Sequence, residues 1–515
     1  MPSVSSDAAL PPLALAIDLG TSSFRALVVD RGGRLVEGLG AQLPYRPEVT
    51  SNGGVQANAT ELFSLLVETL DRAMASLGEH GADIATVGVA SFWHALLGID
   101  GVGRPVTSVL YWGDTRSAPD AAALRRALPE AEVLDRTGCR FHSSYWPAKL
   151  EWLRRVWPEA AARTARWLGF AEYALGRLCG EPAQAMSISM ASGCGLLDVH
   201  DLVWDEPLLT ALRLSPAMLP PLVDPPTSFS LTGEWAVRWP VLANVPWFPA
   251  LGDGACANVG AGAIGPSRIA LTLGTSGAMR LVLPAPPGAE WHAPPRLWAY
   301  RLDRERAVLG GALSNGGNLM QWLWGLLGAA PNGSEMTAAA ALEPDAHGLT
   351  LLPFVAGERS PEWHDRADGV VTGLTLATTP ATLLRAAMEA VAFRFAAIYA
   401  DLRPLADPDP QIVAGGAAIL SSPAWLHIVA DTLGAPLIAL PADDEVTARG
   451  AAAMALVAAG IIPSLADLPD PAADGRAIPP NHANHERYQA AMNRQARLER
   501  QLFGRESTWE DLGAP

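Results

Sequence analysis

The chain has 515 residues, a hydrophobic fraction of 49% and a formal net charge of −16. The chain is longer than a typical single domain, so we expect two large domains with well-packed hydrophobic cores. Because the average surface is acidic, it disfavours nucleic acid and anionic membranes, and we expect a small-molecule partner, no nucleic acid and no membrane.

The first segment, residues 1–12, lacks the basic and apolar regions of a signal peptide, and its prolines predict a disordered leader. The longest run of small apolar residues, 450–462, is shorter than the roughly 20 residues that span a bilayer and predicts a buried helix. No CxxC pair or neighbouring histidine cluster indicates a disulfide framework or a zinc site. The sequence therefore predicts free buried thiols in a cytoplasmic protein, at Cys139, Cys179, Cys194 and Cys256.

The residues LGTS occur twice, in residues 17–30 and again in residues 271–283. In both copies an apolar run enters the glycine, two hydroxyl residues follow, and a second apolar run leaves with an arginine in it, Arg25 or Arg280. Each copy predicts a strand, a tight polar turn and a strand. Helical periodicity over 59–77 and a strand pattern over 85–92 add to the first half, so we expect a duplicated α/β fold. A boundary is expected in the glycine-rich residues 249–262.

A glycine followed by hydroxyl residues at a hairpin turn lets a ligand approach the backbone, and its outward N–H and O–H groups suit a phosphate. Two such turns would grip a polyphosphate, although one alone is usually structural. Asp18, just before the first turn, could hold Mg²⁺ directly or through water, or could only cap the turn. A Walker loop is excluded because no Gly-Lys occurs, and Lys149 is the sole lysine.

A third glycine element lies in residues 412–434, where a short apolar strand runs into Gly415 and Gly416. A helix then begins with Ser422 as its N-cap and Pro423 at its first position. A helix start beside paired glycines suits a nucleotide. The remaining segment predicts a loop over 468–481 and a polar-faced terminal helix over 485–504.

The order of the segments resembles that of the FGGY carbohydrate kinases, members of the actin-like ATPase superfamily. The resemblance covers residues 14–460 and is carried by the two LGTS turns, SFWHALLGID, YWGDTR, GDGACANVGAG, SNGGNLMQWL, LLPFVAGERSPEW and AGGAAILSSPAW. It implies an α/β fold of two duplicated actin-like (ribonuclease H-like) ATPase domains with an active-site cleft between them. Residues 12–252 would form the N-terminal sugar- and phosphate-binding domain, and residues 253–500 the C-terminal nucleotide-binding domain.

The resemblance also implies roles for single residues. Asp253 of the GDG segment would be the general base that takes the proton from the attacking sugar hydroxyl, whereas the residues alone indicate only a turn. The implied substrate-binding residues are Asp253, Trp93, His94, Trp112, Asp114 and Arg116. The implied ATP-binding residues are Thr21, Ser22, Gly274, Thr275, Ser276, Gly317, Gln321, Gly415, Gly416 and Ala417.

Some of these residues could instead have a purely structural role. A lone histidine in an apolar strand, such as His94, is ordinarily a satisfied core residue, and Asp114 and Arg116 could form a surface ion pair. Arg140, His142 and Lys149 follow in a segment that borders the sugar pocket in the family. Lys149 could instead cap a helix.

These features predict a kinase that uses ATP and Mg²⁺ to phosphorylate a primary hydroxyl of an open-chain sugar or sugar acid. FHSSYWPAK, MSISMASGCGLLD and SNGG most resemble gluconate kinases, so D-gluconate is the first choice. A xylulokinase acting on D-xylulose or a related ketose is the alternative. An actin-like ATPase without a small acceptor, or a sugar-binding sensor, is a further possibility that acceptor-dependent ADP release would test. The sequence does not fix the oligomeric state and leaves a homodimer open.

Overall fold

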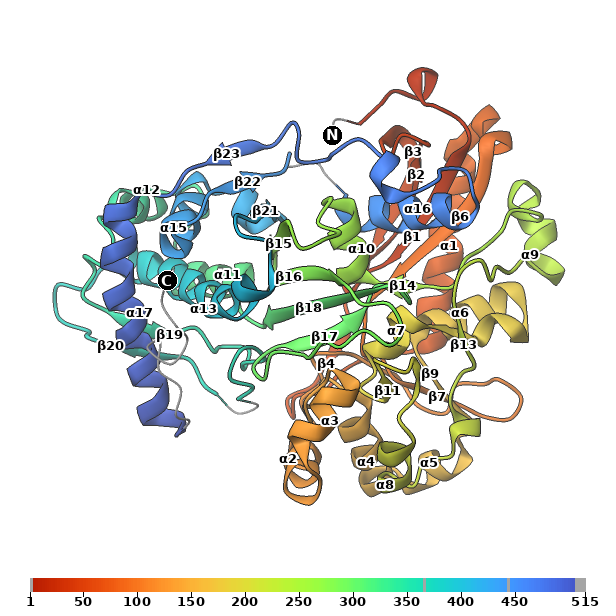
Figure 1. Ribbon diagram of the computed structural model, residues 1–515, viewed down its shortest axis with the longest axis horizontal. Helices are drawn as coiled ribbons and strands as arrows, with labels where there is room; N and C mark the ends of the chain where they lie inside the picture. The colour runs from red at the N-terminus through yellow and green to blue at the C-terminus, as the bar shows by residue number, and fades with distance from the viewer. Residues whose placement is uncertain (1–2, 365–366, 442–444, 505–515) are drawn as a thin grey trace.

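The computed structural model describes residues 3–364, 367–441 and 445–504. Two large β-sheets form its frame, one in each half of the chain (Figure 1). Each sheet is packed into a hydrophobic core of its own. The two-domain α/β organisation expected from the sequence is therefore present.

The first sheet is an antiparallel meander extended by two parallel strands, in the order β14-β6-β1-β2-β3. β1 is apolar along nearly its whole length because it is buried on both faces of the sheet. Helix α1 lies against β2 and β3 and begins at Asn58, whose side chain caps it by accepting hydrogen bonds from two backbone N–H groups. The bounds are β1 (Leu13–Leu19), β2 (Ser23–Val29), β3 (Leu35–Pro44), β6 (Ile84–Ser91), β14 (Leu251–Gly252) and α1 (Ala59–Leu77).

The second sheet repeats this plan, in the order β17-β18-β16-β15-β21-β22-β23. Strands β15, β16 and β18 form the antiparallel meander, and β21 and β22 extend it in parallel to β15. β15, β16, β18 and β21 thus correspond to β1, β2, β3 and β6, as expected from a duplication. The bounds are β15 (Arg268–Leu273), β16 (Gly277–Pro284), β17 (Trp298–Arg301), β18 (Arg306–Leu313), β21 (Gln411–Gly415), β22 (Leu437–Ala439) and β23 (Arg476–Ile478).

Helices cover the second sheet, with α13 packed between the sheet, α11, α12 and α15. The last helix, α17, packs on α15 and on the small sheet of β19 and β20, at the left of Figure 1. The bounds are α11 (Gly317–Leu327), α12 (Ser334–Ala341), β19 (Thr350–Leu352), β20 (Val370–Thr372), α13 (Pro380–Leu402), α14 (Ala417–Leu420), α15 (Pro423–Leu433) and α17 (His482–Phe503).

A long insertion between β6 and β14 is built from short helices and strands, most of them in the lower right part of Figure 1, with α9 at the upper right. β8 of this insertion pairs with β5, which ties the insertion to the segment before α1. The bounds are β4 (Glu48–Val49), β5 (Val55–Ala57), β7 (Leu97–Ile99), β8 (Val109–Leu110), α2 (Ala118–Ala127), α3 (Glu130–Thr137), α4 (Trp146–Val156), α5 (Pro158–Arg163), β9 (Arg166–Leu168), α6 (Phe170–Cys179), β10 (Met186–Ser187), α7 (Ile188–Ser192), β11 (Leu197–Asp198), β12 (Val203–Trp204), α8 (Glu206–Ala211), β13 (Leu222–Val223) and α9 (Gly233–Arg238).

Two helices from distant parts of the chain cross behind the first sheet. α10 (Asp253–Gly260) follows β14, and α16 (Val446–Ala458) comes from the C-terminal half but packs on β1 and β6 (Figure 1). A Cβ atom at Gly450 would lie 1.8 Å from the carbonyl oxygen of Cys256, and one at Gly260 equally close to that of Val446. The two backbones therefore approach to a distance that only glycine allows.

The local predictions from sequence are largely confirmed. The helix expected over 59–77 is α1, Ser422 caps α15 at Pro423, the terminal helix is α17, and all four cysteines are free and buried. Two predictions are wrong. The leader is ordered from residue 3, because Val4 exchanges backbone hydrogen bonds with β3, and the loop over 468–481 contains the edge strand β23. None of the described helices is long and apolar enough to cross a membrane.

The helix crossing predicts a large cost for one added methyl group. Gly450→Ala should lower the free energy of unfolding by about 2–4 kcal/mol, because the overlap is with backbone that cannot rotate away. Gly325→Ala is the matched control, since Gly325 also lies inside a helix but an added Cβ there would meet nothing within 4 Å. It should be neutral or stabilising by up to about 1 kcal/mol. Urea unfolding of both variants measures this, and equal stabilities would contradict the prediction.

Candidate active site

Three strands of the first sheet end at one edge and deliver the residues of the site. β1 ends just after Asp18, β6 ends just before the pair Trp93 and His94, and β14 ends directly before Asp253. The strands run in parallel, so these ends meet: Asp18 of β1 and Leu251 of β14 both pair in register with Ala90, the penultimate residue of β6. The carboxyl edge of such a sheet is the usual place for a ligand.

Asp253 is the first residue of α10 and is partly buried at the N-terminal end of that helix, where the helix dipole favours an anion. Burial raises the pKa of its carboxyl group, while the charge of Arg280 and backbone N–H groups of Gly254 and Trp93 oppose the rise. The Gly254 N–H donates to Asp253 Oδ1 at 2.8 Å. A carboxylate made more basic in this way is suited to accept a proton from a hydroxyl.

Asp18 is buried beside the first hairpin turn. Its Oδ2 atom accepts a hydrogen bond of 3.0 Å from Arg25, whose Nε atom lies 3.5 Å from Glu445. Burial raises the pKa of Asp18 to about 6, Arg25 lowers it, and the charges of Asp253 and Glu445 raise it further. Carboxylates that repel one another form a donor set that a hard divalent cation fits, so Asp18 could hold Mg²⁺ directly or through water.

His94 adopts a left-handed backbone conformation with φ of 71° and is buried. Its Nδ1 atom lies 2.5 Å from the carbonyl oxygen of Gly193, which can only accept, so Nδ1 carries the proton and Nε2 is an acceptor. Burial lowers the pKa of His94 to about 3, which keeps the ring neutral. A neutral histidine with an acceptor nitrogen can receive a hydrogen bond from a sugar hydroxyl.

Trp93 is buried next to His94. Its indole N–H donates to the carbonyl oxygen of Ser189 at 2.9 Å. The indole takes the space that a side chain at Gly252 would need, because a Cβ there would lie 1.8 Å from the ring. On its other side the Tyr300 ring lies 4.9 Å away, edge to face. Trp93 thus links the turn that carries His94 to the start of α10.

Trp112 joins the sugar-side segment to the first phosphate turn. Its indole N–H donates to the hydroxyl of Thr21 at 3.3 Å. Arg359, from the C-terminal half, lies over the indole of Trp112: its guanidinium carbon is 4.5 Å from the centre of a ring of that indole. Trp112 is therefore held where the hairpin turn and a cation meet.

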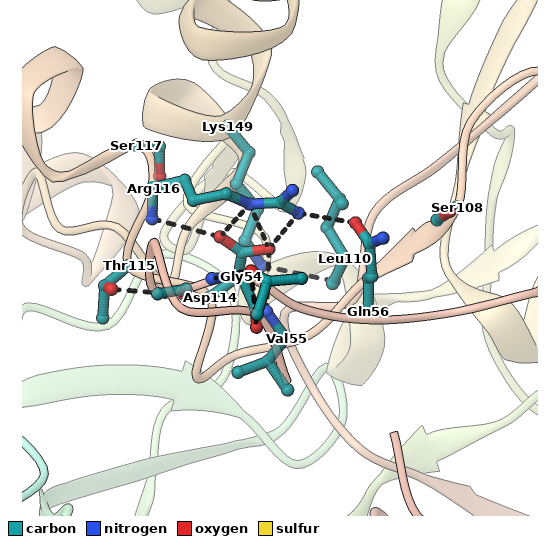
Figure 2. Close-up of polar contacts among 12 residues, drawn as sticks. Gly54, Val55, Gln56, Ser108, Leu110, Asp114, Thr115, Arg116, Ser117 and Lys149 are labelled. Carbon is teal, nitrogen blue, oxygen red and sulfur yellow. Dashed lines mark hydrogen bonds and ion pairs between the residues drawn. The ribbon is translucent and has the colours of Figure 1, made fainter. Parts of the chain in front are cut away.

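Asp114 and Arg116 form an ion pair, as one interpretation of the sequence allowed, but it is buried rather than on the surface (Figure 2). Asp114 accepts from three nitrogen positions of Arg116 and from the backbone N–H of Val55, at 2.5–3.2 Å. Arg116 also donates to Gln56 and lies 4.4 Å from the centre of the Trp152 ring. The pair fastens the turn that presents Trp112; a direct contact of either residue with substrate stays a prediction.

The other basic residues that the sequence placed near the sugar pocket also have partners within the protein. Arg140 pairs with Glu130 at 2.9 Å, and His142 Nδ1 accepts from the backbone N–H of Ser144 at 3.1 Å. Lys149 is buried inside α4 and donates to the carbonyl oxygen of His94 at 2.7 Å, while burial lowers its pKa to about 7. Lys149 therefore supports the strained backbone at His94 and does not cap a helix.

The residues expected near the nucleotide gather around the second hairpin turn. The N–H of Gly317, at the start of α11, donates to the carbonyl of Gly274 at 2.8 Å. Gly416 has φ of +99°, and a Cβ there would lie 2.6 Å from the carbonyl oxygen of Leu273. A Cβ at Gly274 itself would meet nothing within 4 Å, so the turn is open for a ligand. The same group includes Thr275, Ser276, Gly415 and Ala417, and Gln321 is exposed on α11.

Sequence reasoning missed two arginines and a tyrosine pair. Arg280 lies beside Asp253, since a Cβ at Gly254 would be 2.9 Å from its Nε atom, and Arg359 lies over Trp112. Tyr145 and Tyr300 share a hydrogen bond of 2.6 Å between the two halves of the chain. Arg280 was visible as the counterpart of Arg25 in the repeated hairpin, but nothing in a loop sequence indicates where Arg359 points.

The duplicated sheets, the two hairpin turns and the aspartate at the start of α10 define a two-domain phosphotransferase of the actin-like type. The family model for the N-terminal domain of FGGY carbohydrate kinases matches residues 13–260, and the model for the C-terminal domain matches residues 269–459. The chain belongs to the FGGY family of carbohydrate kinases and is an ATP-dependent kinase of a carbohydrate acceptor.

Relatives with three different acceptor names resemble this chain. It is 29% identical to a gluconokinase of Bacillus subtilis, over 87% of this chain and 88% of that one. It is 32% identical to a glycerol kinase of Trichlorobacter lovleyi, over 87% and 90% of the two chains. The structure of ligand-bound xylulose kinase from Lactobacillus acidophilus superposes with a TM-score of 0.86 at 22% identity, covering 96% and 98%. These matches establish the family and the fold, and the acceptor has to be argued from the site.

The position of Asp253 predicts a loss of chemistry without a loss of nucleotide binding. Asp253→Asn should lower kcat by about 10²–10⁴-fold, because the amide cannot take the proton of the attacking hydroxyl. Affinity for ATP should be preserved, since the hairpin turns are untouched. Steady-state kinetics and nucleotide titration measure the two effects, and a variant with nearly unchanged kcat would remove Asp253 from the role of base.

Arg280 predicts a displaced pH profile. Its positive charge favours the ionised form of Asp253, so Arg280→Met should raise the pKa of that carboxyl group. The acidic limb of log kcat should therefore move to higher pH by about one unit, whatever happens to the maximal rate. Arg304→Met removes an exposed arginine paired with Asp224 and serves as control. An acidic limb at the wild-type position in Arg280→Met would contradict the electrostatic coupling.

Proposed function

We propose that this kinase phosphorylates the primary hydroxyl of D-gluconate with ATP. The observation that supports this choice is a pair of arginines near Asp253 that have no ion-pair partner. Arg280 and Arg359 both act electrostatically on Asp253 and on each other, and neither forms an ion pair with a carboxylate of the described residues. An acceptor with a carboxylate supplies an ion-pair partner for one of these guanidinium groups, whereas a neutral ketose does not.

The placement of the residues supports the following roles. Asp253 takes the proton of the attacking hydroxyl, His94 Nε2 accepts from another hydroxyl, and Trp93 and Trp112 bound the carbon chain. Thr21 and Ser22 on one turn, and Gly274, Thr275 and Ser276 on the other, bind the phosphates through N–H and O–H groups. Gly317, Gln321 and the segment 415–417 border the nucleoside. In this proposal residues 12–252 form the sugar- and phosphate-binding domain, and residues 253–500 form the nucleotide-binding domain, which also contributes Asp253.

Asp18 fits the role of the Mg²⁺ ligand because its carboxylate lies among other carboxylates at the edge of the first sheet. The ion would neutralise the phosphate oxygens during transfer. Arg25 then competes with the metal for one oxygen of Asp18 and keeps the carboxylate oriented. The four free, buried thiols suit the reducing cytoplasm in which we place the enzyme.

A screen of acceptors tests the proposal. With Mg-ATP fixed, D-gluconate should give a kcat/KM at least about tenfold above that of D-xylulose, D-ribulose, L-ribulose or glycerol, which is about 1.4 kcal/mol in transition-state binding. ADP release is the readout, and Asp253→Asn, which should abolish acceptor-dependent release, is the control. A higher value for D-xylulose would assign the alternative, a xylulokinase. ADP release that no acceptor stimulates would favour an actin-like ATPase.

A further inference from the structure

We propose that Arg359 is the specificity-determining residue of this kinase, binding the acceptor's carboxylate through its guanidinium group. The proposal rests on the function proposed above and assigns the carboxylate of a sugar acid to one side chain. Four other basic residues lie in or near the sugar-side motifs, and each is hydrogen-bonded within the protein: Arg116, Arg140, His142 and Lys149. Arg359 has no hydrogen bond or ion pair with any described residue.

The loop that carries Arg359 is anchored from behind. Glu358 accepts backbone hydrogen bonds from Glu362 at 3.0 Å and from His364 at 2.8 Å, which closes the loop on itself. The same carboxylate pairs at 2.9 Å with Arg394 of α13, and Arg394 pairs at 2.6 Å with Glu499 of α17. Arg359 follows Glu358 directly and extends to Trp112 of the other half of the chain. The loop is thus built to present this arginine.

A second residue of the loop also reaches the acceptor side. The Trp363 ring lies 5.4 Å from the ring of His142 and 6.2 Å from that of Tyr145, and its indole N–H donates to a carbonyl at 2.8 Å. The loop therefore touches the N-terminal half at two points, through Arg359 and Trp363. These two contacts fix the position of the guanidinium against the acceptor side.

The guanidinium group of Arg359 has hydrogen-bond donors without a partner. Its Nε atom is shielded from solvent and has no hydrogen-bond partner, and a buried donor left unpaired is costly. One face of the group stacks on Trp112, which leaves the in-plane N–H donors available. Two parallel N–H groups match the two oxygens of a carboxylate, a geometry that lysine cannot reproduce.

Arg280 and Arg359 differ in how closely they neighbour Asp253. Arg280 packs against Gly254, beside Asp253, and its charge acts more strongly on Asp253 than that of Arg359 does. The reacting hydroxyl must lie within hydrogen-bond reach of Asp253, so Arg280 neighbours that end of the acceptor. The carboxylate of gluconate is at the opposite end of an extended chain, and Arg359 is the cation that this end can reach.

The test compares two acceptors that differ only in charge at one end, D-gluconate and its neutral amide, D-gluconamide. Wild-type enzyme should prefer gluconate in kcat/KM by about 10²-fold, the value of a charge-assisted bidentate contact. In Arg359→Gln this preference should fall at least about tenfold through a higher KM for gluconate, while KM for gluconamide and for ATP change less than about threefold. Arg166→Gln, which removes a surface arginine paired with Glu181, is the matched control.

The outcomes separate this inference from the proposed function. If wild-type enzyme does not use gluconate, the proposed function fails. If it uses gluconate but Arg359→Gln slows both acceptors equally, or raises KM for ATP instead, Arg359 does not read the carboxylate and the inference is overturned. Arg359→Lys provides the test if the glutamine variant does not fold: it should keep an intermediate preference for gluconate, and a wild-type preference would contradict the bidentate contact.

Discussion

The backbones of α10 and α16 touch where each helix has a glycine, and the geometry of the cleft depends on this contact. Cys256 and Gly450 meet at a distance that excludes any side chain, and α16 rests in turn on Gly88 of β6. Asp253 begins α10, so the position of its carboxylate is set by a helix more than 190 residues later in the chain, which starts at Val446. Asp253 is thus held by backbone packing rather than by side chains of its own loop.

The duplication places a carboxylate and an arginine together twice, with different results. In the first half Arg25 bonds directly to Asp18 and leaves a site that suits a cation. In the second sheet Arg280 projects from the equivalent hairpin toward Asp253 without forming an ion pair, so both charges stay available to ligands. One repeated hairpin thereby gives a hydrogen-bonded carboxylate–arginine pair in one half and an unbonded pair in the other.

What could be predicted from the sequence was local. Periodicity located α1, and local residue chemistry located both hairpins and the Ser422 cap. The GDG segment indicated only a turn, whereas the structure places Asp253 at the start of α10. Arg359 and the packing of α16 on the first sheet could not be found in this way, because both are contacts between segments far apart in sequence. The order of the N-terminal segment was missed for the same reason. Its prolines predicted disorder, but β3 pairs with the backbone N–H and C=O groups of Val4.

The seating of α16 on the first sheet has a consequence for the order in which the protein can form during synthesis. Ala14, Ala16 and Val29 on the back of this sheet are covered by Ala448 and Ala452 of α16. A nascent chain that has completed β1, β2 and β6 still lacks this cover, and its apolar face stays open until nearly the whole polypeptide has left the ribosome. This face of the N-terminal sheet is then the last part of its core to close, an order of events that exposes apolar surface during synthesis.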